Sequence, residues 1–273
     1  MRSSLVMAGR TEAVLARVTG TLTAIERERA AQFTREGDRR DYIAAHLLIR
    51  HCAAAYLGLS DQEPTLVQHC DQHGPGSHGR PSIVEAPELG VSLSHTAGYV
   101  AVVAGPGRVG IDAEHVPEGP ADAALIDFAL APGELALAGG DSLRLIRQWV
   151  RKEALVKRGE LTLDDFPLTD LSDIFAIADT SDSSGSSGGS DPSRRSDPSD
   201  SYGGSDLSRR SDPSAPCDSP DLTRSGLRPS PHGEAGGAVT FGWRGRRLLE
   251  WTAGTVVATA ITDHPAELRR VDA

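Results

Sequence analysis

Residues 180–238 have a composition that cannot support a hydrophobic core. Of these 59 residues, 41 are Ser, Gly, Asp or Pro, and the sequence GGSDPSRRSDPS at 188–199 recurs as GGSDLSRRSDPS at 203–214. A repeat protein needs an apolar stripe in every unit, and these two units have none. Too little apolar surface is present to offset the entropy lost on ordering. We therefore predict a disordered insert, with a Ser/Arg-rich phosphorylation or docking segment as the alternative.

The ordered fold must come from the residues on either side of this insert. Predicted helices cover 25–57, 121–130 and 142–158, and predicted strands cover 91–95, 99–104, 109–114, 174–178, 239–243, 247–251 and 255–261. The order of helix and then strands occurs twice along the chain. This order favours an α+β fold of two pseudo-symmetric halves, each a helix packed on a small, mostly antiparallel sheet. Residues 1–108 would form the N-terminal half, and residues 109–179 with 239–273 the C-terminal half, which the insert interrupts.

Charge, cysteines and hydropathy exclude several classes of protein. A net charge of −10 argues against a protein that wraps nucleic acid. The three cysteines are far apart and form no disulfide framework, which is typical of a reducing compartment. We find no signal peptide and no apolar run near the roughly 20 residues of a membrane span, so we expect a cytoplasmic protein. A zinc site around Cys70 is the weaker alternative to a polar loop there, because its histidine spacing fits no standard pattern.

Two acids, Asp112 and Glu114, alternate on the predicted strand at 109–114. Side chains two residues apart on a strand project from the same face, so these carboxylates lie close enough to repel each other. A divalent cation relieves that repulsion in a cleft, and Mg²⁺ prefers hard oxygen ligands. An exposed, solvated acidic pair is the alternative.

The helix at 142–158 carries a second group of charged residues. Trp149, Glu153 and Lys157 are spaced i, i+4, i+8 and share one face. Glu153 could add a third carboxylate to a metal site, and Lys157 could reach a phosphate; an ordinary surface ion pair is the alternative. Of the 28 basic residues only two, Lys152 and Lys157, are lysines, and both lie on this helix. That placement marks it as the candidate active-site helix.

Three further features, Ser94-His95, Arg80 and residues 105–110, are candidates for catalytic or phosphate-binding sites. Ser94 and His95 are adjacent on a predicted strand and point to opposite faces, which argues against a Ser–His hydrolase pair and favours contacts to phosphate. Arg80, in a predicted turn at Gly79-Arg80-Pro81, is another candidate phosphate ligand. Residues 105–110 match the dinucleotide pattern G-x-G-x-x-G, but a strand follows instead of the required helix. We predict a hairpin turn at 105–107.

Taken together, four motifs resemble a known family. They are Gly79-Arg80-Pro81, Ser92-Leu93-Ser94-His95-Thr96, Val109-Gly110-Ile111-Asp112-Ala113-Glu114, and Trp149-Val150-Arg151-Lys152-Glu153-Ala154-Leu155-Val156-Lys157. Their order and spacing are similar to those of the 4′-phosphopantetheinyl transferases of the large, monomeric, surfactin-synthetase-type class. The resemblance covers residues 25–178 by motif and 239–262 by strand pattern. Ser92 stands where the family often has Asn, and Thr96 where it often has Ser.

The resemblance implies an enzyme that transfers the 4′-phosphopantetheine group of coenzyme A to a serine of an apo acyl or peptidyl carrier protein and releases 3′,5′-ADP. It implies Mg²⁺ on Asp112, Glu114 and Glu153, with Glu153 or a metal-bound water as the base and Lys157 on the pyrophosphate. The coenzyme A contacts would come from Arg50, Arg80, Ser94, His95, Lys152 and Lys157. We expect a monomer that binds neither nucleic acid nor membrane.

Two other functions are compatible with these residues. One is a non-catalytic module that binds coenzyme A or a carrier protein, and the other is a Mg²⁺-dependent phosphodiester hydrolase that uses the same acids. Carrier domains are usually acidic, and this chain is too, so a local basic or apolar patch would have to receive them. The first 50 residues, with nine arginines against six acids, are a candidate for that surface.

Overall fold

The computed structural model describes residues 2–59, 63–70, 74–76, 79–177 and 237–272. Contacts divide the chain into two units, and all the described residues belong to the unit formed by Met1–Ala178 and Thr223–Ala273. The predicted insert, apart from residues 237 and 238, lies outside the described residues. No helix within the described ranges is long and apolar enough to cross a bilayer.

The described residues form a mixed α+β fold, as the sequence predicts. The helices are α1 (Thr11–Arg17), α2 (Ala24–Ala31), α3 (Glu36–Leu57), α4 (Ala123–Ala129), α5 (Pro132–Ala138), α6 (Ser142–Arg158) and the 3-10 helix η1 (Leu163–Leu168). The strands are β1 (Ser4–Arg10), β2 (Leu66–Cys70), β3 (Gly74–Gly76), β4 (Arg80–Ile83), β5 (Leu89–Thr96), β6 (Tyr99–Pro106), β7 (Gly110–His115), β8 (Phe175–Ala176), β9 (Val239–Trp243), β10 (Arg246–Ala253), β11 (Val256–Thr262) and β12 (Ala266–Arg270).

These strands form three sheets. The first has the order β12-β1-β6-β5, the second β7-β11-β10-β9-β8, and a small third sheet has the order β3-β2-β4. The strand pairs are antiparallel except for β1 and β12, which run parallel with Ser4 opposite Ala266. β12 comes from the predicted C-terminal half but joins the sheet of the N-terminal half, so the chain crosses the predicted division at residue 109.

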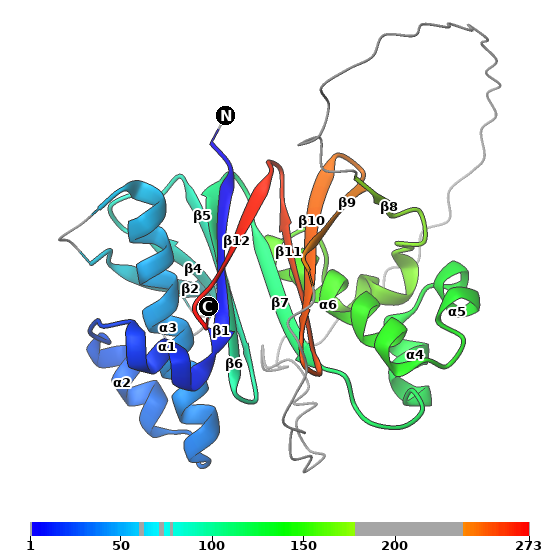
Figure 1. The fold of residues 1–273 in the computed structure, drawn as a ribbon, viewed down its shortest axis with the longest axis horizontal. Coiled ribbons are helices and arrows are strands. Elements are labelled where there is room, and N and C mark those ends of the chain that lie inside the picture. Colours follow the sequence, from blue (N-terminus) through cyan, green and yellow to red (C-terminus); the bar gives the residue numbers. More distant parts are fainter. Residues whose placement is uncertain (1, 60–62, 71–73, 77–78, 178–236, 273) are drawn as a thin grey trace, which may run out of the picture. The chain divides into compact units, whose positions relative to one another are not determined.

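The two large sheets lie face to face, with α1–α3 outside the first and α4–α6 outside the second (Figure 1). Strand β6 is buried on both faces. Val100, Val102 and Ala104 face α3, whereas Tyr99 and the other alternate residues pack between the sheets. This position explains why residues 99–104 form a continuous apolar run, because a strand covered on both sides needs no polar face.

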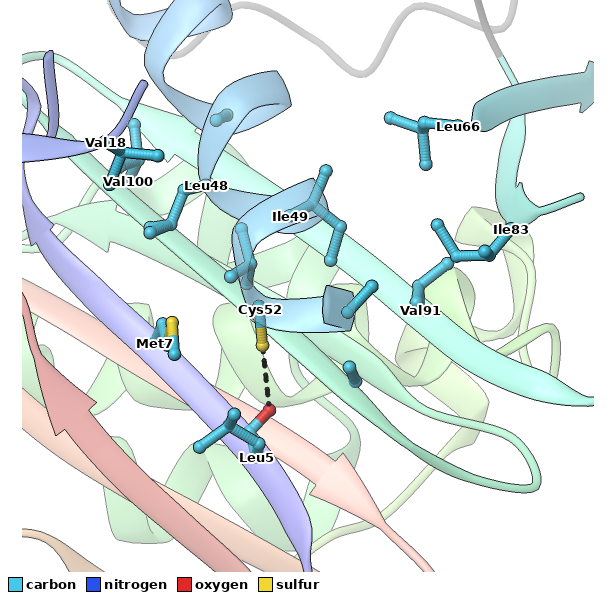
Figure 2. Packing of buried hydrophobic residues seen from close by; sticks show 14 of the residues in the cluster. Leu5, Met7, Val18, Leu48, Ile49, Cys52, Leu66, Ile83, Val91 and Val100 are labelled. Atoms are coloured by element: carbon cyan, nitrogen blue, oxygen red, sulfur yellow. Dashed lines mark hydrogen bonds between the residues drawn. The ribbon is translucent and has the colours of Figure 1, made fainter. Parts of the chain in front are cut away.

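Helix α3 provides most of the apolar surface that covers the first sheet. Leu48, Ile49 and Cys52 are fully buried against β1 and β5, and Figure 2 shows this packing. The Cys52 thiol donates a hydrogen bond to the Leu5 carbonyl oxygen at 3.4 Å. Burial raises the pKa of that thiol to about 12, so Cys52 is an unreactive core residue.

The structure corrects three local predictions. The helix predicted at 25–57 is broken into α2 and α3, because Arg35 is extended (φ −100, ψ 130), which lets α2 fold back onto α3. Residues 105–107 are not a hairpin turn, because the strands on either side, β6 and β7, belong to different sheets. Arg80 and Pro81 lie in strand β4, and only Gly79, at φ +101, makes the turn that precedes it.

Candidate functional site

Helix α6 has the bounds that the sequence predicts, and local signals define both of its ends. The Asp141 side chain accepts a hydrogen bond from the Arg144 amide at 2.8 Å, which caps the N-terminus, and Gly159 ends the helix at φ +73. The helix packs directly on β7. A Cβ atom on Gly110 would overlap the Ala154 carbonyl oxygen, so the glycine of the Gly-Ile-Asp-Ala-Glu motif permits this close approach.

This packing brings the acids of β7 and the charged face of α6 into one cluster. The Lys157 ammonium lies 2.7 Å from Asp112 Oδ1, and the charges of Asp112, Glu114, Glu153 and Lys157 act on one another. Asp112 and Glu153 are buried, at 3% and 4% exposure. From β5, Ser94 donates a hydrogen bond to Asp112 Oδ1 at 2.9 Å. The structure therefore brings together the four charged residues that the sequence names for a metal site and a phosphate contact.

Burial and mutual repulsion change the proton affinities within this cluster. The pKa of Glu114 is raised to about 8, first by burial and then by the Asp112 charge. The same two causes raise the pKa of Glu153 to about 7. Partial burial alone would lower the pKa of the Lys157 ammonium, but Asp112 outweighs it and holds that pKa above its usual value. The cluster is short of positive charge, since one lysine faces three carboxyl groups.

Two buried carboxylate oxygens fit a further cation. Asp112 Oδ2 and Glu153 Oε1 are buried without a hydrogen-bond partner among the described residues. Unpaired buried oxygens are costly, and a bound cation would satisfy them. Among the described residues no three His, Cys, Asp or Glu side chains are grouped so that they could hold a metal ion unaided. Mg²⁺ commonly needs only one or two protein carboxylates, because substrate phosphates and waters complete its shell.

Three of the predicted phosphate contacts lie at or beside the cluster. His95 is half-buried, and burial, followed by the Lys157 charge, lowers its pKa to about 4, so its imidazole is neutral at neutral pH. Arg80 is exposed at the end of α6, where its Nη1 donates to the Arg158 carbonyl oxygen at 3.4 Å. Ser94 is buried, and its hydroxyl proton is used by Asp112, which makes it a carboxylate partner in this structure.

Arg50 is not available to a ligand, which corrects the prediction that it binds coenzyme A. Its Nη2 lies 2.8 and 2.6 Å from the two carboxylate oxygens of Glu26, and its Nη1 donates to the His46 carbonyl oxygen at 2.8 Å. The His46 imidazole lies 2.6 Å from Glu26 Oε1. Arg50 is 3% exposed, so its charge is used to bind α2 to α3.

We expect Glu26 to make the fold sensitive to acid. Burial opposes its ionisation, but the hydrogen bonds from His46 and Arg50 outweigh this and lower its pKa from 4.5 to about 2. Because the folded-state pKa lies below the unfolded-state value, the stabilisation is complete above about pH 4.5 and is lost as the pH falls towards 2. Thermal unfolding followed by circular dichroism should show a smaller decrease in this range for Glu26→Gln than for the unaltered protein. Parallel curves for the two proteins would contradict this role.

Lys152 is also a structural residue, so the prediction that it binds the cofactor is wrong. It is 0% exposed, and its ammonium donates to Glu134 Oε2, Phe166 O and Ala129 O at 2.6, 2.7 and 2.8 Å. These three acceptors match the three protons of an ammonium group. Lys152 thus joins α6 to α4, α5 and η1.

A cavity of about 520 Å³ lies elsewhere, against a different face of α6. Arg144, Arg147 and Arg151 line it, and Glu250 lies 3.0 Å from Arg147 and 2.9 Å from Arg151. None of the predicted site residues lines this cavity. The candidate functional site is therefore the seam between β5, β7 and α6, where the carboxylates lie.

The structure adds Thr96 to the site. Its hydroxyl donates to Glu114 Oε2 at 3.3 Å from the same strand as Ser94. The spacing of Ser92, Ser94 and Thr96 at alternate positions could have indicated this from the sequence, because it puts three hydroxyls on one face of a strand.

No family model matches the chain, and no curated protein matches it.

Proposed function

We propose that this protein transfers the 4′-phosphopantetheine group of coenzyme A to a serine of an apo acyl or peptidyl carrier protein, with release of 3′,5′-ADP. One observation carries the proposal: Asp112, Glu114, Glu153 and Lys157 form one cluster, and its two buried members, Asp112 and Glu153, each have a carboxylate oxygen without a hydrogen-bond partner among the described residues. The motifs that supply these residues are those that resemble the phosphopantetheinyl transferases.

In the proposed reaction the carrier serine oxygen forms a bond to the β-phosphorus of coenzyme A, and the bond from that phosphorus to the departing 3′,5′-ADP breaks. Glu153 takes the serine proton, because its buried oxygen Oε1 has no hydrogen-bond partner among the described residues. Lys157 leaves Asp112 to neutralise charge on the pyrophosphate. His95 is neutral and donates an N–H to a phosphate oxygen. Bound Mg²⁺ would neutralise pyrophosphate charge. Asp112 and Glu153, each with a buried oxygen that has no hydrogen-bond partner among the described residues, would hold it, and Glu114 is the further ligand that the resemblance implies.

The fold is compatible with the arrangement that the resemblance implies. Each large sheet carries a long helix on its outer side, α3 on the first and α6 on the second, which supports two pseudo-symmetric halves. Coenzyme A would bind between them at the seam of β5 and β7. We further propose that the protein acts as a cytoplasmic monomer on the carriers of fatty acid, polyketide or nonribosomal peptide assembly.

A transfer assay tests this proposal. Purified protein, coenzyme A, Mg²⁺ and a panel of apo carrier proteins should yield carriers heavier by one phosphopantetheine group in intact-protein mass spectra. The gain should disappear with a chelator and return with added Mg²⁺. Absence of a mass gain on every carrier, while a known transferase modifies the same panel, would reject the activity. Tight coenzyme A binding without a mass gain would indicate a binding module instead, and 3′,5′-ADP release without a carrier would indicate a hydrolase.

A further inference from the structure

Strands β5 and β7 meet at the junction of the two large sheets, where hydrogen bonds that involve side chains of β5 join them instead of a backbone ladder. Each is the terminal strand of its sheet, and within the described strands β5 pairs only with β6 and β7 only with β11. The two strands are nevertheless in contact. Three buried hydroxyls on alternate residues of β5, those of Ser92, Ser94 and Thr96, span this junction.

The three hydroxyls have different partners. Ser92 Oγ accepts a hydrogen bond from the backbone amide of Ile111 at 3.2 Å, so it holds the strand itself. Ser94 donates to Asp112 Oδ1 at 2.9 Å and Thr96 to Glu114 Oε2 at 3.3 Å. One strand face therefore provides one contact to backbone and two contacts to the carboxylates of the candidate metal site.

We propose that Ser94 and Thr96 are positioning residues, which orient the carboxylates of Asp112 and Glu114 for a divalent cation. The inference deepens the proposed function and rests on its metal site. Asp112 Oδ1 receives both Ser94 and Lys157, which leaves Oδ2 buried without a hydrogen-bond partner among the described residues. The hydroxyl thus selects which carboxylate oxygen stays available to the cation.

The physical reason is the cost of holding two carboxylates on one face of a strand. Asp112 and Glu114 repel each other, and without a fixed partner each would rotate away from the other. A hydrogen bond from a buried hydroxyl fixes the carboxylate rotamer before the cation binds. Less side-chain conformational entropy is therefore lost on binding. Loss of such outer partners typically costs about 10–100-fold in metal affinity. This role replaces the predicted contact between Ser94 and a coenzyme A phosphate.

The test is Mn²⁺ binding to the full chain without coenzyme A or carrier, measured by electron paramagnetic resonance. We expect Ser94→Ala and Thr96→Val to weaken binding by about 10–100-fold, with the larger loss at Ser94, and Thr96→Ser to restore it. Ser92→Ala is the matched control, because it removes a hydroxyl from the same strand face but touches no carboxylate. It should lower the melting temperature and leave Mn²⁺ affinity unchanged.

Several results would overturn the inference. They are unchanged Mn²⁺ affinity in folded Ser94→Ala and Thr96→Val, an equal loss in Ser92→Ala, and no Mn²⁺ binding by the unaltered protein. Failure of the proposed function has a different pattern. Suppose that the unaltered protein binds Mn²⁺, that the two variants bind it more weakly, and that no carrier gains mass. The positioning role is then supported, and the proposed transferase activity is rejected.

Discussion

Lys152→Met is expected to destabilise the protein by about 3–5 kcal/mol, because it leaves the Glu134 carboxylate buried without its cation. The Ala129 and Phe166 carbonyl oxygens lose the same donor. Lys152→Arg should also destabilise, because a planar guanidinium does not match the three acceptors around this ammonium. Urea unfolding followed by tryptophan fluorescence measures the loss. Adding Glu134→Gln to Lys152→Met should recover part of the stability, since no buried charge then remains.

Two comparisons separate this structural role from a role in ligand binding. Arg144→Met, on the exposed side of the same helix, should change the free energy of unfolding by less than about 1 kcal/mol. Folded Lys152→Met, kept at low temperature, should bind coenzyme A as the unaltered protein does. A tenfold weaker coenzyme A affinity at unchanged stability would restore the cofactor-binding role that the sequence predicts for Lys152.

Glu153→Gln should reduce transfer to carrier protein by about 10²–10⁴-fold, because an amide cannot accept the serine proton. The same change should raise the stability of the metal-free protein at pH 8. The folded-state pKa of Glu153 is raised from 4.5 to about 7, so the folded state loses stability as the pH rises between these values. The variant should therefore melt at a higher temperature than the unaltered protein at pH 8, and the difference should shrink as the pH falls towards 4.5.

Glu118→Gln is the matched control for Glu153→Gln, because Glu118 is an exposed acid just beyond β7. It should alter neither transfer nor the pH dependence of melting. Normal transfer by Glu153→Gln would remove Glu153 from the mechanism. A melting temperature below that of the unaltered protein at pH 8 would show that Glu153 stabilises the fold instead of opposing it.

The parts of the site that the sequence predicted correctly depend on local geometry. The bounds of α6 follow from Asp141 and Gly159, and the alternation of Asp112 and Glu114 follows from the period of a strand. These signals act over a few residues. The sequence analysis first joined β7 to α6 through a shared metal site of Asp112, Glu114 and Glu153. The resemblance, whose motifs carry both segments, then supported that assignment.

The errors at Arg50 and Lys152 concern partners that are distant in the sequence. Arg50 and Lys152 were assigned to coenzyme A because the resemblance implies those contacts. Their acids, Glu26 and Glu134, lie 24 and 18 residues away on other helices, where no periodicity reveals them. Strand β12 was missed for the same reason, since its partner β1 lies at the other end of the chain.

The parallel pairing of β12 with β1 has a consequence for synthesis of the chain. Strand β1 is synthesised before both of its partners; it can pair with β6 once about a hundred residues have followed, but its other edge stays unpaired until Ala266–Arg270 is made. Until then β1 presents unpaired backbone groups, which are a template for pairing with other chains. The first sheet is therefore completed only after β12 has been synthesised. A nascent chain stalled before β12 should depend on chaperones to avoid aggregation.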